Sequence, residues 1–385
     1  MLTAFSNGSI LRPDGFSTGQ AVLVQDGYIS AIVDAAGAQA RAAAAVDLAG
    51  RMLLPGYIDV QVNGGGGVLF NDSPTVEGIR QIAAAHARFG TTGFLPTLIS
   101  DDEAVVARAI AAVDAAIAAG VPGVLGIHIE GPYLNQARKG VHNPAHFRKL
   151  DDKAVSLLCS LRRGVTLVTL APERADRAIL AQLVAKGVII AAGHTDATAD
   201  EIATARRHGL SGFTHLFNAM SQLTAREPGV VGAALGDDES YCGIIVDGKH
   251  VDPRVLKVAL RAKRHDRFML VTDAMPVVGS STPGFQLQGR AIRVIDDYCV
   301  DEHGTLAGTA LNMGRAVRNA VSLLGLPHGE AVRMASEYPA RFLGLGASRG
   351  RIELGLRADF VVADEAGNIQ ETWIGGQRVA PSPAA

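Results

Sequence analysis

The sequence predicts a (β/α)₈ TIM-like barrel with a small β-sandwich domain formed by both chain termini. Through the middle of the chain, short apolar runs rich in β-branched residues alternate with helix-like stretches. These runs are almost continuously apolar, which is typical of parallel strands covered on both faces. The two ends of the chain instead carry short β-like runs separated by turn residues. A doubly wound open sheet is the alternative for the alternating middle of the chain.

Eight runs account for the strands expected in the barrel: Tyr57–Val62, Thr92–Leu98, Val124–Glu130, Val165–Leu170, Val188–Gly193, Gly212–Asn218, Tyr241–Val246 and Arg267–Asp273. Helix-like stretches such as "DDEAVVARAIAAVDAAIAAG" lie between most of them. Several of these stretches open with Asp or Thr, which can cap a helix, and several close with Gly.

The terminal segments differ from the middle in pattern. "AVLVQDGYISAIVD", from Ala21 to Asp34, contains two β-like runs around the turn signal Asp26-Gly27. "GLRADFVVADEAGNIQETWIGGQRV" near the C-terminus has the same character. We therefore expect residues 1–54 and 346–385 to form one composite β domain and residues 55–345 to form the barrel.

Composition limits the class of protein. The chain has 385 residues, 48% of them hydrophobic and 19% charged, and a net charge of −2. This balance gives no reason to expect a nucleic acid or a membrane as partner. The three cysteines, Cys159, Cys242 and Cys299, form no CxxC pair, and no secretory signal is recognisable at the N-terminus. We expect a cytoplasmic protein without a thiolate metal site.

Polar residues at the expected strand ends should carry the chemistry, because the C-terminal ends of the strands form the active-site face of such a barrel. Glu130, His194 and His215 follow the third, fifth and sixth strands. Two imidazoles and one carboxylate make a three-ligand metal site that leaves a position open. His128 shares a strand face with Glu130 and could pair with it, but we expect it to lie deeper in the barrel and to orient or pack.

Four further features stand at or near the strand ends. Asp273 ends the eighth strand, where a carboxylate can move protons to and from a reacting group. Arg226 and His250 follow the sixth and seventh strands and suit a phosphate or carboxylate. The Gly64–Gly67 run matches no phosphate-binding motif and is expected to form a tight turn that gives a substrate room. The remaining histidines considered, expected to be solvated, are His86, His208, His265, His303 and His328.

Several longer motifs resemble a known family. "LLPGYIDVQVNG" and "GLRADFVV" are similar to segments of the amidohydrolase superfamily, metal hydrolases on a (β/α)₈ barrel. Six segments more narrowly resemble the N-acetylglucosamine-6-phosphate deacetylase family: "GIHIEGPYLNQARKGVHNP", "AAGHTDAT", "THLFNAMSQLTAREPGVVGAAL", "YCGIIVDGKHVDP", "VTDAMPVVG" and "GTLAGTALNM". This resemblance runs through nearly the whole chain.

The resemblance implies a role for each matching residue. It makes Glu130, His194 and His215 the metal ligands, Asp273 the catalytic acid and base, and His142 a residue near the acetamide. It assigns substrate binding to Asn218, Ala219, Arg226, His250, Leu306, Ala307 and Gly308. Arg226 and His250 would hold the 6-phosphate. It also implies a homodimer or homotetramer in which a partner supplies part of the phosphate site.

The first strand departs from the superfamily. Its usual His-x-His is here Gln61-x-Asn63, and a neutral amide is a poor ligand for a transition metal beside imidazole. The fourth strand ends in "VTLAPE", without a lysine that could bridge two metals. We expect one divalent ion per subunit, Zn²⁺ first and Fe²⁺, Co²⁺ or Mn²⁺ as alternatives. Gln61 and Asn63 are expected to hydrogen-bond water or substrate.

The expected activity is the metal-dependent deacetylation of N-acetylglucosamine 6-phosphate to glucosamine 6-phosphate and acetate in amino-sugar catabolism. The galactosamine epimer is an alternative substrate. A non-catalytic sugar-phosphate-binding relative is a further alternative, although it should have lost a ligand or Asp273, and all four residues are present.

Overall fold

The barrel prediction is confirmed by a computed structural model of the chain, in which residues 2–295 and 298–379 are described. Eight parallel strands follow one another in chain order around the ring. They are β8 (Tyr57–Val62), β11 (Thr91–Ile99), β12 (Gly126–Glu130), β13 (Val165–Leu170), β14 (Ile189–Ala192), β15 (Leu210–Phe213), β16 (Tyr241–Ile244) and β17 (Phe268–Leu270).

The ring closes between its first and last strands. Val62 forms a parallel bridge with Ala274, and the Asp273 N–H donates to the Gln61 carbonyl at 3.0 Å. A closed ring has no free edge, so the open-sheet alternative is wrong.

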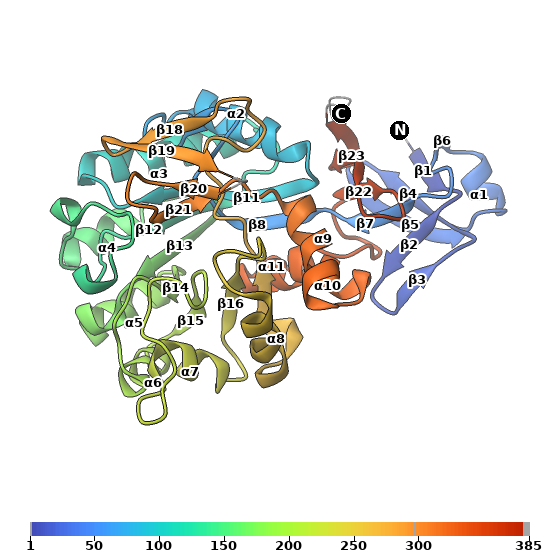
Figure 1. The fold of residues 1–385 in the computed structure, drawn as a ribbon. Helices are drawn as coiled ribbons and strands as arrows, with labels where there is room; N and C mark the ends of the chain where they lie inside the picture. The colour runs from blue at the N-terminus through green and yellow to red at the C-terminus, as the bar shows by residue number, and fades with distance from the viewer. Residues whose placement is uncertain (1, 296–297, 380–385) are drawn as a thin grey trace.

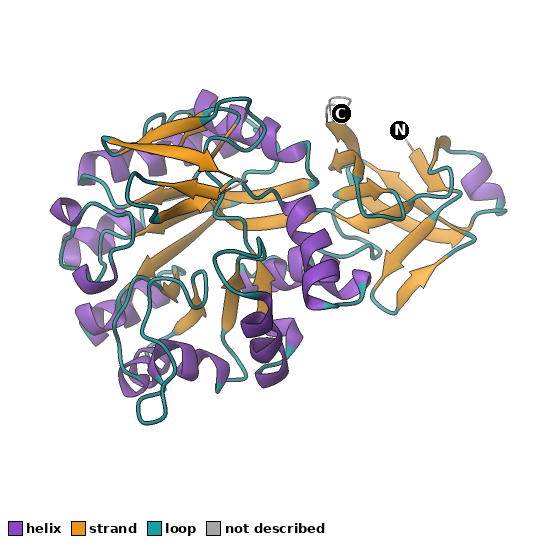
Figure 2. Ribbon diagram, in the orientation of Figure 1, coloured by secondary structure: helices purple, strands orange, loops and turns teal. Residues whose placement is uncertain are grey.

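Helices cover the outside of the ring (Figure 2). Those between the strands are α2 (Val76–Ala87), α3 (Glu103–Ala118), α4 (Asp152–Leu158), α5 (Arg177–Ala185), α6 (Ala199–Arg207), α7 (Gly229–Leu235) and α8 (Pro253–Ala262). After the ring come α9 (Met313–Leu324), α10 (His328–Ala335) and α11 (Glu337–Phe342). Within the described residues, no helix has both the length and the apolar character needed to cross a bilayer.

The second domain lies beside the barrel and carries strands from both ends of the chain (Figure 1). One sheet has the order β5-β4-β1-β6, and the other has the order β24-β23-β22-β7-β2-β3. Its N-terminal strands are β1 (Leu2–Ser6), β2 (Ser9–Arg12), β3 (Gly15–Ser17), β4 (Gln20–Gln25), β5 (Tyr28–Asp34), β6 (Ala44–Asp47) and β7 (Met52–Pro55), with the short helix α1 (Ala38–Arg41) between β5 and β6. Its C-terminal strands are β22 (Phe360–Ala363), β23 (Ile369–Ile374) and β24 (Gln377–Val379).

The two sheets are held together by aromatic packing. Phe5 of the first sheet meets Phe360 and Trp373 of the second edge-on, with ring centroids 5.3 and 4.8 Å apart. Such edge-to-face pairs add to the hydrophobic gain of burial. Because this core joins residues from both termini, the composite domain needs both chain ends.

A small antiparallel sheet was not predicted. It consists of β18 (Gly284–Leu287), β19 (Arg290–Ile295), β20 (Tyr298–Val300) and β21 (Leu306–Thr309) and follows the last barrel strand. Its first turn contains Gln288 and Gly289, both in the left-handed region. A glycine in a two-residue turn between β-like runs is a hairpin signal in the sequence. We call the described residues of this region, 284–295 and 298–309, the flap sheet.

The glycine run forms the expected tight turn. Gly64–Gly65 (β9) pairs antiparallel with Val68–Leu69 (β10), and Gly66 and Gly67 make the turn with positive φ. A Cβ on Gly65 would lie 2.8 Å from the His86 ring. His86 is completely buried and its Nε2 lies 2.9 Å from the Gly64 carbonyl. The expectation that His86 is solvated is therefore wrong, since it packs beneath this hairpin.

Candidate metal and substrate site

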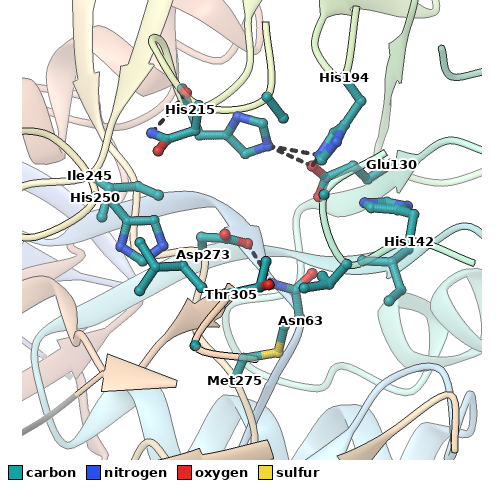
Figure 3. Close-up of a pocket in the computed structure, with 18 residues that line it drawn as sticks. Asn63, Glu130, His142, His194, His215, Ile245, His250, Asp273, Met275 and Thr305 are labelled. Atoms are coloured by element: carbon teal, nitrogen blue, oxygen red, sulfur yellow. Dashed lines mark hydrogen bonds and ion pairs between the residues drawn. The ribbon is translucent and has the colours of Figure 1, made fainter. Parts of the chain in front are cut away.

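Glu130, His194 and His215 converge at the C-terminal end of the barrel (Figure 3). Glu130 Oε1 lies 3.1 Å from His194 Nε2 and 2.9 Å from His215 Nε2. The two Nε2 atoms are 3.1 Å apart. All three side chains are buried.

Their hydrogen bonds fit a bound cation. His194 Nδ1 lies 2.9 Å from the Arg138 carbonyl, which can only accept, so Nδ1 carries a proton. In the neutral ring, Nε2 then presents a lone pair to the Glu130 carboxylate and to His215 Nε2. Two imidazole nitrogens and one carboxylate oxygen that present lone pairs to each other repel unless a cation lies between them, so this set suits a divalent metal.

Two metal-ligand candidates and the acid–base candidate leave their strands with an unusual backbone. His194, His215 and Asp273 have φ of 49°, 34° and 51°, in the left-handed region that non-glycine residues rarely adopt. Each follows the last residue of its strand by two or three positions. Such strained conformations cluster at functional sites, where the surrounding structure holds them.

Asp273 accepts hydrogen bonds from two side-chain amides at the end of the first barrel strand. Asn63 Nδ2 donates to its Oδ1 at 2.6 Å, and Gln61 Nε2 donates to the same oxygen at 3.0 Å. Gln61 Nε2 also lies 3.1 Å from Glu130 Oε2. Burial and the negative charge of Glu130 raise the pKa of Asp273 to about 6, while His215, His250 and the Asn63 amide oppose this rise. The amides thus orient two carboxylates.

Glu130 stays ionised despite its burial. Burial alone would raise its pKa, but hydrogen bonds and positive charge from the protonated forms of His194 and His215, which face Glu130 when no cation lies between the three groups, outweigh that effect and hold the pKa well below its usual range. A carboxylate is therefore available as a ligand.

His142 lies beside the cluster, with its ring centroid 4.3 Å from that of His194. Burial, followed by the nearby His194, holds the pKa of His142 well below its usual range. The ring is therefore neutral at physiological pH.

His250 is held from behind by an acid. Its Nδ1 lies 2.6 Å from Asp247 Oδ2, and the N–H groups of Lys249 and His250 donate to Asp247 Oδ1. This arrangement fixes the ring and leaves Nε2 available to a ligand.

A cavity of about 390 Å³ opens onto this cluster. The predicted site residues that line it are Asn63, Glu130, His142, His194, His215, Asn218, Ala219, His250, Asp273, Leu306 and Gly308. Gln61 is buried behind the lining and Ala307 packs in the core of the flap sheet. Arg226 lies on an exposed loop. Among the described residues that line the cavity there is no lysine or arginine.

His128 lies outside the ligand cluster. Its Nδ1 is 3.2 Å from Thr97 Oγ1, and its Nε2 is 2.7 Å from Thr169 Oγ1. With both nitrogens used inside the barrel, His128 packs and orients, as expected.

Several lining residues escaped sequence reasoning. Ile99, Ile245 and Met275 give the cavity apolar walls, and Thr305 reaches its rim from the flap sheet. They are ordinary residues in ordinary runs, and only the closed ring and the flap sheet bring them to one cavity. The hairpin signal Gln288-Gly289 could have revealed the flap sheet.

Comparison with known proteins places this geometry in context. Residues 52–379 match the family model described as "Amidohydrolase family". An N-acetylgalactosamine-6-phosphate deacetylase of Shewanella sp. (strain ANA-3) is 46% identical over 84% of this chain and 82% of its own length. An N-acetylglucosamine-6-phosphate deacetylase of Haemophilus influenzae is 35% identical over 82% of this chain and 84% of its own length.

Solved structures agree in fold. The N-acetylglucosamine-6-phosphate deacetylase of Pasteurella multocida matches with a TM-score of 0.94 at 35% identity, over 99% of this chain and 100% of that chain. A mutant of the Mycobacterium smegmatis enzyme in complex with N-acetyl-D-glucosamine-6-phosphate matches with a TM-score of 0.89 at 30% identity, over 99% of both chains.

Proposed function

Because the chain belongs to the amidohydrolase family, we propose that it hydrolyses the acetamide of an N-acetylhexosamine 6-phosphate and releases acetate. The observation that carries the proposal is the convergence of Glu130, His194, His215 and Asp273 on one cavity, whose lining includes His142, Asn218 and His250 but not Arg226. That cavity lies in the size range of small-molecule sites.

Glu130, His194 and His215 would hold one divalent ion, for which Zn²⁺ is the first candidate. Such an ion supplies Lewis acidity toward the amide carbonyl and lowers the pKa of a water molecule. Gln61 and Asn63 serve Asp273 instead of a second ion, which supports a mononuclear site.

Asp273 is the proton carrier of the proposed reaction. Its carboxylate accepts a proton from the attacking water as the oxygen bonds to the acetamide carbon. It returns that proton to the nitrogen as the carbon–nitrogen bond breaks, which releases the amine and acetate. The Asn63 and Gln61 amides keep the Asp273 carboxylate oriented through both transfers, and His142 lies where it can donate to the carbonyl oxygen.

The preferred hexosamine is proposed to be the galactosamine epimer. The sequence motifs alone favour the gluco epimer, but the 46% identity to a galactosamine-type relative exceeds the 35% identity to the glucosamine-type relative from Haemophilus influenzae. N-acetylglucosamine 6-phosphate is the second candidate, supported by the 0.94 TM-score of the Pasteurella multocida structure.

The phosphate is proposed to bind at the His250 end of the cavity, where the His250 ring is held by its contact with the Asp247 carboxylate. One histidine is little charge for a phosphate dianion. Arg226, exposed on its loop, is proposed to complete the site from a second copy in a homodimer or homotetramer.

The deciding experiment measures acetate release from both 6-phosphates side by side, with and without chelator and re-added metals. A higher kcat/KM for the galactosamine substrate supports the preference, and the reverse order would reassign it. The absence of acetate release from either sugar phosphate by metal-loaded protein would overturn the proposed function. Two tightly held ions per chain would overturn the mononuclear site.

A further inference from the structure

We propose that Ser100, which follows barrel strand β11, is a positioning residue that fixes His142 as the tautomer carrying its proton on Nε2. None of the family motifs quoted above contains this serine. The inference rests on the proposed deacetylation, because the Nε2 proton matters for the reaction only if His142 donates to the substrate carbonyl.

Two groups of Ser100 meet the same ring nitrogen. The Ser100 backbone N–H donates to His142 Nδ1 at 3.3 Å, and Ser100 Oγ lies 2.8 Å from that atom. A backbone N–H can only donate, so Nδ1 must present its lone pair. The Ser100 hydroxyl then also donates to Nδ1, and the proton of the neutral ring resides on Nε2.

The surroundings hold Ser100 in place. Its side chain is 1% exposed and that of His142 is 2% exposed, so water does not compete for Nδ1. A Cβ on Gly131 would lie 2.3 Å from Ser100 Oγ, so the glycine leaves the space that the hydroxyl uses. From the flap sheet, Gln288 donates to the Ser100 carbonyl at 2.5 Å and accepts from the Asn143 N–H at 3.2 Å.

The tautomer decides what His142 can do. With Nδ1 directed at Ser100, the opposite edge of the ring faces the cavity that His142 lines (Figure 3). An Nε2–H there can donate to a carbonyl oxygen as negative charge develops on it. The same proton prevents Nε2 from acting as a metal ligand or as a general base, which leaves proton transfer to Asp273.

The experiment combines spectroscopy with kinetics. ¹⁵N shifts of histidine-labelled protein distinguish nitrogen atoms with and without a proton, and the spectrum of His142→Gln assigns the His142 signals. Wild-type protein should show His142 protonated at Nε2. Ser100→Ala removes the shorter 2.8 Å donor and leaves only the longer 3.3 Å backbone donor on Nδ1, so it should give a mixed tautomer signal. It should also lower kcat about ten-fold with KM nearly unchanged, the size of one lost hydrogen bond to a reacting group. Ser100→Thr should restore both readouts.

Ser336→Ala is the matched control, because Ser336 is also a buried serine and donates to the Val332 carbonyl at 2.7 Å, away from the lining of the cavity. It should leave the His142 signals and kcat unchanged. Wild-type His142 protonated at Nδ1 would overturn the proposal, as would Ser100→Ala with unchanged tautomer or unchanged kcat. If wild-type protein releases no acetate, the proposed function fails, yet the ¹⁵N spectrum still decides the tautomer.

Discussion

His86→Gln should remove one defined contribution to the acid sensitivity of the fold. His86 is completely buried under the Gly64–Gly67 hairpin, and burial lowers its pKa from 6.5 to about 4, although its bond to the Gly64 carbonyl opposes this. The unfolded chain therefore takes up a proton near pH 6.5 that the folded chain refuses until about pH 4. Stability is fully present above pH 6.5 and is lost as the pH falls toward 4.

The size of the effect follows from the two pKa values. Between pH 7.5 and pH 4.5, proton uptake by the unfolded state costs the wild-type protein about 2.5 kcal/mol through His86 alone. His86→Gln keeps an N–H that can reach the Gly64 carbonyl but has no proton to bind. The difference in unfolding free energy between wild type and variant should therefore shift by about 2.5 kcal/mol over this range.

Urea denaturation of both proteins at pH 7.5 and pH 4.5 gives the unfolding free energy of each. The double difference is the change between the two pH values in the stability difference between wild type and variant. Stability losses that both proteins share, including those from loss of a bound cation, cancel in it. His303→Gln is the matched control, because His303 is exposed and should give no shift. A double difference for His86→Gln as small as that of the control would refute the reasoning. An NMR titration that finds the pKa of His86 in the folded protein near 6.5 would also refute it.

Three further outcomes concern the site. Asp273→Asn should lower kcat by at least about 100-fold, the usual contribution of a positioned acid–base group, while the protein still binds metal. Turnover and metal content are measured together. Near-wild-type turnover would contradict the assignment. Asn63→Ala should lower kcat about ten-fold, since it removes the 2.6 Å donor to Asp273, and stopped-flow turnover at saturating substrate checks this. Replacing both Gln61 and Asn63 by His should not by itself add a second ion in elemental analysis, because the fourth strand lacks a bridging lysine; uptake of two ions would show that the amides alone set the count.

The alternation of apolar runs with helix-like stretches was enough to predict the barrel from the sequence. Each barrel strand lies within a few residues of its expected run, because strands covered on both faces must be almost wholly apolar and this leaves a clear record in the sequence. The same rule placed the ionisable residues at the strand ends, and so the sequence alone indicated Glu130, His194 and His215 as metal-ligand candidates. The ends of the chain were recognisable as β structure by their turn residues.

Tertiary structure alone decided which partners these residues have. Gln61 and Asn63 could be recognised as unusual, but their donation to Asp273 depends on closure of the ring between β8 and the segment after β17, more than 200 residues away in sequence. Ser100 reaches His142 because the neighbouring strands β11 and β12 lead into adjacent loops, and Gln288 reaches Ser100 and the His142 loop because the flap sheet folds back over the barrel. The burial of His86 follows from a hairpin packed against one helix face. Local patterns record which face of an element is apolar, whereas a hydrogen bond between distant segments leaves no periodic trace, so the sequence determined the framework and the fold determined the polar contacts inside it.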